Sequence, residues 1–153
     1  MRDKLKSMNK ATLQKIAEIR IRSSEEPRAG ASEEAITALI KLAGSNLSDD
    51  YLEFLRFSDG LSDDLWSVNA ILKERYPEAR RLMPGALIIG NNGGPNLYAI
   101  DLRSGDLSKM QYVKTYTVGI GWENICGQWQ SFYALLCYMF QDWDEDEQDE
   151  NGW

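Results

Sequence analysis

The sequence contains no histidine, and only two of its 153 residues are cysteine. Without histidine, Ser–His–Asp and Cys–His catalytic groups, histidine-liganded metal sites and imidazole general bases are all excluded. Cys126 and Cys137 are too few for a disulfide framework or a four-thiolate zinc site. We therefore expect no catalytic site, no metal and no cofactor, and conclude that the protein is not an enzyme.

Long apolar runs are also missing. No stretch approaches the roughly 18 apolar residues of a membrane span, and the basic start Met1–Lys4 is not followed by the apolar segment of a secretory signal. These absences predict a cytoplasmic protein that does not bind membranes. A chain of 153 residues fits one domain, which at this size buries about two thirds of its unfolded surface.

Acidic residues exceed basic ones by 24 to 17, which gives a net charge of -7. This charge argues against direct binding of nucleic acid and favours a basic partner. The distribution is uneven, because residues 1–28 are basic and residues 142–150 hold seven acids and no base. We predict an appended basic helix and linker over 1–30, a domain over 31–141 and an acidic, disordered tail over 142–153 that serves solubility or binds a partner.

Two helices are predicted from their capping residues. Ser32 precedes two glutamates and an apolar stripe that stops at Gly44, and Ser48 precedes two aspartates and a second apolar stripe before Gly60. Acids in a first turn stabilise the positive end of the helix dipole. Both segments therefore have the start and stop signals of short amphipathic helices.

Strands are predicted in the middle of the chain and a helix after them. Apolar runs at 86–89 and 97–102 flank a glycine-rich turn, and further strands are expected near 110–113 and 115–120. A short strand is expected at 65–68, helix formers over 70–82 are interrupted by Pro77, and a last helix is expected from about Gln128. This order predicts an α+β fold with a single twisted, mainly antiparallel sheet packed against several helices.

The glycine-rich turn and the acidic pairs are the two features that invite a chemical interpretation. The turn at 90–95 lacks the lysine and the following helix of a phosphate-binding loop, so its glycines indicate an ordinary turn. Asp49 and Asp50 are already explained as first-turn acids. The aspartates near residue 60 are interpreted as solvated surface charges, with a metal site as the weaker alternative.

A surface for a protein partner is the remaining interpretation. The sequence places acids for electrostatic steering beside an aromatic residue of the kind that dominates interface energetics, and places amides around the glycine turn. Ordinary turn chemistry explains the amides equally well. The candidate partner-binding residues are Asp59, Asp63, Asp64, Trp66, Asn91, Asn92 and Asn96.

Several motifs in fixed order resemble one known family. The first signature is an acidic helix start, a Leu-x-x-x-Tyr helix and an Asp-Gly ending, and the second is a hairpin with a glycine-rich turn and a strand ending in Asp, followed by a Trp and an aromatic helix. The corresponding segments are Ser32–Ile36, Leu47–Leu55, Asp59–Gly60, Leu87–Gly94, Leu97–Arg103 and Trp129–Phe140. Together they resemble the SUKH superfamily, which includes fungal cell-wall-assembly regulators and bacterial immunity proteins.

This resemblance implies a non-catalytic α+β domain that works by binding protein. Relatives of the immunity type bind and neutralise a polymorphic or contact-dependent toxin, frequently a nuclease, whose phosphate-binding surface is basic. An intracellular regulatory adaptor is the alternative that the resemblance leaves open. The resemblance carries over no contact residues, since relatives face different partners.

Overall fold

A computed structural model of the chain describes residues 29–61 and 64–139. The predicted N-terminal helix and acidic tail lie outside these residues, and the division of the chain at 31 and 141 stays a prediction. The described elements are α2 (Glu33–Ala43), α3 (Asp49–Phe57), α4 (Val68–Leu72), α5 (Ala79–Leu82), β1 (Ala86–Asn91), β2 (Asn96–Asp101), β3 (Gln111–Tyr116), β4 (Gly127–Trp129) and two short 3₁₀ turns at Leu107–Lys109 and Trp122–Asn124. A further helical segment covers 132–139.

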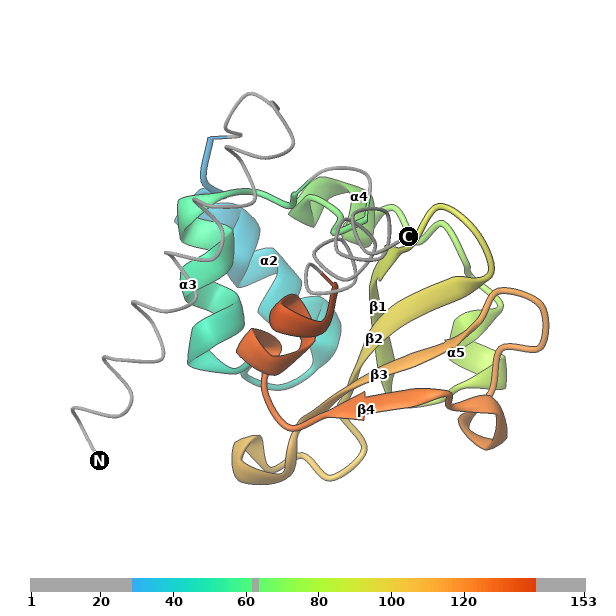
Figure 1. The fold of residues 1–153 in the computed structure, drawn as a ribbon. Coiled ribbons are helices and arrows are strands. Elements are labelled where there is room, and N and C mark those ends of the chain that lie inside the picture. Colours follow the sequence, from blue (N-terminus) through green and yellow to red (C-terminus); the bar gives the residue numbers. More distant parts are fainter. Residues whose placement is uncertain (1–28, 62–63, 140–153) are drawn as a thin grey trace, which may run out of the picture.

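The four strands form one antiparallel sheet in the order β1-β2-β3-β4. Every strand pairs with its neighbour in sequence, so the sheet is a simple meander (Figure 1). The helices α2 and α3 and segment 132–139 lie on one side of this sheet, and α5 lies on the other. The predicted α+β fold with a mainly antiparallel sheet is confirmed.

Strand β2 shows how the sheet separates two hydrophobic cores. Tyr98 and Ile100 belong to the larger core beneath α2 and α3, whereas Leu97 and Ala99 belong to a smaller core with α5. Successive side chains of a strand point to opposite faces, so a strand covered on both faces is apolar throughout. Four of the six residues of β2 are buried as a result.

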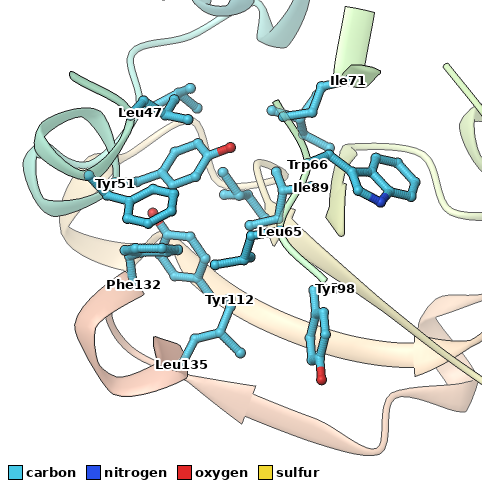
Figure 2. Packing of buried hydrophobic residues seen from close by; sticks show 14 of the residues in the cluster. Leu47, Tyr51, Leu65, Trp66, Ile71, Ile89, Tyr98, Tyr112, Phe132 and Leu135 are labelled. Carbon is cyan, nitrogen blue, oxygen red and sulfur yellow. The ribbon is translucent and has the colours of Figure 1, made fainter. Parts of the chain in front are cut away.

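Four aromatic rings, those of Tyr51, Phe54, Tyr112 and Phe132, form the centre of the larger core. Figure 2 shows Tyr51, Tyr112 and Phe132 packed together. The Phe132 ring centroid lies 5.0 Å from that of Tyr51, 4.9 Å from that of Phe54 and 5.7 Å from that of Tyr112. These rings come from α3, β3 and segment 132–139, and tilted or edge-to-face pairs of this kind add to the stabilisation from burial. The cluster therefore joins the helical layer to the sheet.

Helix α2 follows its sequence signals closely. The Ser32 hydroxyl accepts a hydrogen bond from the Ala35 N–H at 3.1 Å, and Gly44 ends the helix with a left-handed φ of 75°. Its N–H donates to the carbonyls of Ile40 and Lys41. The predicted cap and stop are both confirmed.

Two expectations about the middle of the chain were wrong. Residues 65–68 do not form a regular strand, because Leu65 makes only isolated bridges and α4 begins at Val68. The strands expected near 110–113 and 115–120 are a single strand, β3, which ends at Tyr116. Its pairing with β2 from Gln111 to Tyr116 is continuous, so nothing interrupts it.

The start of the last helix was also wrongly placed. Gly127–Trp129 is strand β4, in which Trp129 pairs with Tyr112, and the helix covers 132–139. The helix is capped at Ser131, whose hydroxyl accepts the Ala134 N–H at 3.0 Å. Trp129 fits the helical spacing of apolar residues although it belongs to a strand. Its ring packs on Tyr138 of the helix, with the two ring centroids 4.6 Å apart.

Candidate functional site

The structure brings together the two sequence stretches that were predicted to bind a partner. Leu65 bridges to Gly90, the Asn91 N–H donates to the Asp64 carbonyl at 3.0 Å, and the Trp66 N–H donates to the Ile89 carbonyl at 2.9 Å. The loop after α3 therefore lies along the outer edge of β1. We call residues 59–61, 64–66 and 91–96 the loop surface.

Gly90 permits this close approach. A Cβ atom at this position would lie 2.1 Å from the carbonyl oxygen of Asp64, well inside contact distance. Because the clash would be with backbone rather than with a flexible side chain, the loop would have to move away from β1. The geometry of the loop surface therefore depends on a glycine at position 90.

The acids of the loop surface differ in what they contact. One carboxylate oxygen of Asp59 accepts the Val68 N–H at 2.8 Å and so holds the start of α4. Asp64 is half-buried beside its bridge to β1, and Asp63 lies outside the described residues. Asp59 thus stabilises the loop, and binding of a partner by these acids stays a prediction.

The three asparagines form the hydrogen-bond network of the β1–β2 turn. The Asn91 side chain accepts the Gly93 N–H and donates to the Asn96 carbonyl, while the Asn92 side chain accepts the N–H groups of Gly94 and Asn96. Side-chain to backbone bonds of this type are the usual role of asparagine in turns. Their amides are therefore used within the turn, and only Asn92 is exposed.

Trp66 lies in the core, whereas its sequence context favoured a surface position. The residue is 6% exposed, and its ring stacks on Tyr76 with an interplanar angle of 3° and lies 5.5 Å from the Arg75 guanidinium, measured to the ring centroid. Figure 2 shows the indole extending away from the aromatic centre of the core. Direct contact of Trp66 with a partner stays a prediction.

A cleft of about 330 Å³ opens beside Trp66 and was missed by the sequence reasoning. Its walls come from the end of α2, the segment between α4 and α5, and the first half of β1; they include Trp66, Tyr76, Arg75 and Ile88. One feature of the sequence could have pointed to this region: the four basic residues between Lys73 and Arg81 in a chain that is acidic as a whole. The cleft itself depends on tertiary packing, which no local pattern reports.

A buried polar cluster was also missed. Asp50 is 7% exposed, and its carboxylate accepts hydrogen bonds from the Ser48 hydroxyl at 2.7 Å, the Tyr51 N–H at 2.8 Å and the Tyr133 N–H at 3.0 Å. The Ser48 hydroxyl also bonds the hydroxyl of Tyr112. Asp50 is a first-turn acid of α3, as predicted, and it is also buried, where it links the start of α3 to the start of the 132–139 helix.

Two tyrosines near this cluster are held in the neutral form. Burial, and then the nearby charge of Asp50, raise the pKa of Tyr112 well above its ordinary value. Burial, and then Asp59, raise the pKa of Tyr51 in the same direction. Neither phenol is poised to act as a base near neutral pH.

Neither a metal-binding cluster nor a membrane-spanning helix is found among the described residues. In residues 29–61 and 64–139, no three side chains of histidine, cysteine, aspartate or glutamate gather closely enough to hold a metal ion. No helix in this part of the chain has the length and apolar character to cross a bilayer. The features of this part of the chain that could bind a partner are the loop surface and the cleft beside Trp66, whereas the Asp50 carboxylate holds the fold together.

Comparison with known proteins places the chain in a family. A comparison of the sequence with curated proteins found no match. The sequence matches the SMI1/KNR4 family (SUKH-1) over residues 30–148, which spans all the described helices and strands. The chain belongs to the SMI1/KNR4 family (SUKH-1).

Proposed function

We propose that this protein is an immunity protein that binds and neutralises a toxin with a basic surface, such as a nuclease domain. The observation that carries the proposal is membership of the SUKH-1 family across residues 30–148. Proteins of this superfamily include bacterial immunity proteins, which act by binding. The net charge of -7 supports a basic partner, because complementary fields raise the rate of association.

The loop surface is the proposed contact. Asp64 lies beside the β1–β2 turn because the Asn91 N–H donates to its carbonyl oxygen, so a partner that contacts Asp64 also reaches the turn. The turn is held by its own asparagine network and changes little on binding. A preorganised surface loses less entropy when it binds than a flexible loop does.

The test is whether a toxin domain is encoded beside this gene and whether this protein neutralises it. Co-expression is expected to protect cells, and the purified pair is expected to form a stable complex in which toxin activity is blocked. Failure of both protection and complex formation would overturn the immunity proposal. Binding to a regulatory protein in place of any toxin would support the adaptor alternative.

Charge reversal tests the proposed contact. Asp63→Lys combined with Asp64→Lys is expected to slow association about tenfold at low salt and much less at high salt. The control is Glu34→Lys with Glu123→Lys, which makes the same change in net charge at exposed positions outside the loop surface. Equal effects of the two pairs would place the contact elsewhere. Trp66→Ala is unsuitable here, since truncating a core tryptophan costs about 3–5 kcal/mol of stability.

A further inference from the structure

The cleft beside Trp66 includes part of the open edge of the sheet. Strand β1 is an edge strand, and the loop surface covers it only from Ile89 onward, where the Trp66 N–H meets the Ile89 carbonyl. Ala86, Leu87 and Ile88 line the cleft instead. The first half of β1 is therefore a sheet edge that the loop surface does not cover and that lines the cleft.

Backbone groups of β1 point out of this edge. The Leu102 N–H donates to the Gly85 carbonyl, and bonded and non-bonded pairs alternate along an antiparallel ladder. Leu87 therefore bonds to β2, while Ala86 and Ile88 turn their N–H and C=O groups outward. The Ala86 N–H donates to the Met83 carbonyl and not to β2, which supports this alternation. Ile88 thus presents a donor and an acceptor in strand geometry.

The walls of the cleft combine apolar surface with positive charge. The stacked rings of Trp66 and Tyr76 form one wall, and Leu42 and Ala43 at the end of α2 add aliphatic surface. The Trp66 indole N–H is buried and has no acceptor among the described residues. An apolar side chain of moderate size fits a space of about 330 Å³.

The charge around the cleft is opposite to that of the whole chain. Residues 73–81 carry four bases and two acids, although the protein has a net charge of -7. Arg80 is paired with Glu74. Arg75 is exposed, lies over the Trp66 ring and makes no ion pair within the described residues. This guanidinium is available to a carboxylate, which it can bind in bidentate fashion.

We propose that the cleft binds an extended acidic peptide segment of a protein partner. The segment pairs with the open edge of β1 at Ala86–Ile88, places an apolar side chain against Trp66 and Tyr76, and presents a carboxylate to Arg75. Strand addition of this kind uses main-chain bonds for affinity and a pocket for specificity. The site shares Trp66 with the loop surface but lies along the other half of β1, and the proposal does not rest on the immunity function.

Selection from a displayed library of random dodecapeptides on the full chain tests the proposal. Enriched peptides are expected to carry aspartate or glutamate next to an apolar residue. An enriched peptide, synthesised with capped ends and a fluorophore, is expected to bind the protein and to protect the Ile88 amide from hydrogen exchange. No enrichment, or enrichment of basic peptides, would overturn the proposal.

Matched variants separate the contacts. Arg75→Glu is expected to weaken binding about tenfold or more, whereas Arg81→Glu, an exposed change of equal charge outside the cleft, is expected to have a much smaller effect. Ile88→Pro removes the outward N–H and is expected to weaken binding about fivefold, while Ile88→Val retains it and keeps the affinity. Proline is tolerated on an edge strand where the N–H faces outward, and circular dichroism checks the fold.

Two outcomes would contradict the peptide assignment. Binding that is unchanged in both Arg75→Glu and Ile88→Pro would place the peptide outside the cleft. N-acetylphenylalanine carries the same carboxylate and apolar group without a strand, and it is expected to compete only weakly. Competition as strong as that of the peptide would show a site for small carboxylates. Toxin binding is expected to be unaffected by Arg75→Glu, so this proposal and the immunity proposal fail separately.

Discussion

Replacing Asp50 by alanine tests a buried carboxylate that joins two helix starts. Its carboxylate accepts hydrogen bonds from the Ser48 hydroxyl and from the N–H groups of Tyr51 and Tyr133. The Tyr133 bond joins residues 83 positions apart in the sequence. Asp50→Ala therefore removes the acceptor for the start of α3 and for the start of the 132–139 helix together.

The expected loss follows from these contacts. Losing the capping oxygen of one helix costs about 1 kcal/mol, and two helix starts share this carboxylate. Leaving the part-buried Tyr133 N–H without the Asp50 acceptor adds about 1–3 kcal/mol. Relief from burying a charge offsets part of the sum. We expect Asp50→Ala to lower the free energy of unfolding by about 3 kcal/mol, a large share of a typical 5–15 kcal/mol.

Urea denaturation followed by circular dichroism measures this loss at neutral pH. Asp49→Ala is the matched control, because Asp49 is the exposed neighbour in the same first turn and its loss is expected to cost less than about 1 kcal/mol. Hydrogen exchange is expected to accelerate at the Tyr133 amide in Asp50→Ala only. Equal destabilisation by the two variants, or unchanged exchange at Tyr133, would refute the assigned role of Asp50.

Three further results are expected from the core and the loop surface. The pKa values of Tyr51 and Tyr112 are raised in the folded protein, so the unfolded chain loses these phenol protons at lower pH than the folded chain does. The free energy of unfolding is therefore unaffected below about pH 10 and then falls by about 2.7 kcal/mol per pH unit for the two groups together. Urea denaturation in which the free energy of unfolding stays constant above pH 10 would contradict this. Gly90→Ala is expected to destabilise the protein by about 2 kcal/mol or more and to expose the Asn91 amide to hydrogen exchange, because its Cβ meets the Asp64 carbonyl. Gly94→Ala is the control, because a Cβ there would meet only the Asn92 side chain, at an ordinary contact distance of 3.7 Å. Phe132→Ala is expected to cost about 3–5 kcal/mol in thermal or urea unfolding, and a loss below 1 kcal/mol would argue against the central position of this ring.

The parts of the fold that were predictable are those determined by nearby residues. Helix α2 depends on Ser32, its first-turn acids and Gly44, whose contacts span three or four positions. The hairpin of β1 and β2 depends on an apolar run on each side of a turn with glycine and asparagine. Such signals act within one element, and a single sequence contains them in full.

The parts that were not predictable depend on contacts between distant residues. Asp50 follows the pattern of a first-turn acid, and only the folded chain shows that Tyr133 lies against it. Trp129 fits the helical spacing of the residues after it, yet pairing with Tyr112 across the sheet outweighs that local preference. The candidate surface residues were identified in two separate stretches, and their contact at Asp64 and Asn91 comes from tertiary structure.

The order of strands in the sheet has a consequence for how the chain folds. Since every strand pairs with its neighbour in sequence, the meander closes only short loops and is expected to form early. The helical layer requires a much longer loop to close, because Asp50 and Tyr133 are 83 positions apart in the sequence. We expect a transition state with an ordered sheet and an undocked 132–139 helix, so that mutations at Phe132 speed unfolding more than they slow folding.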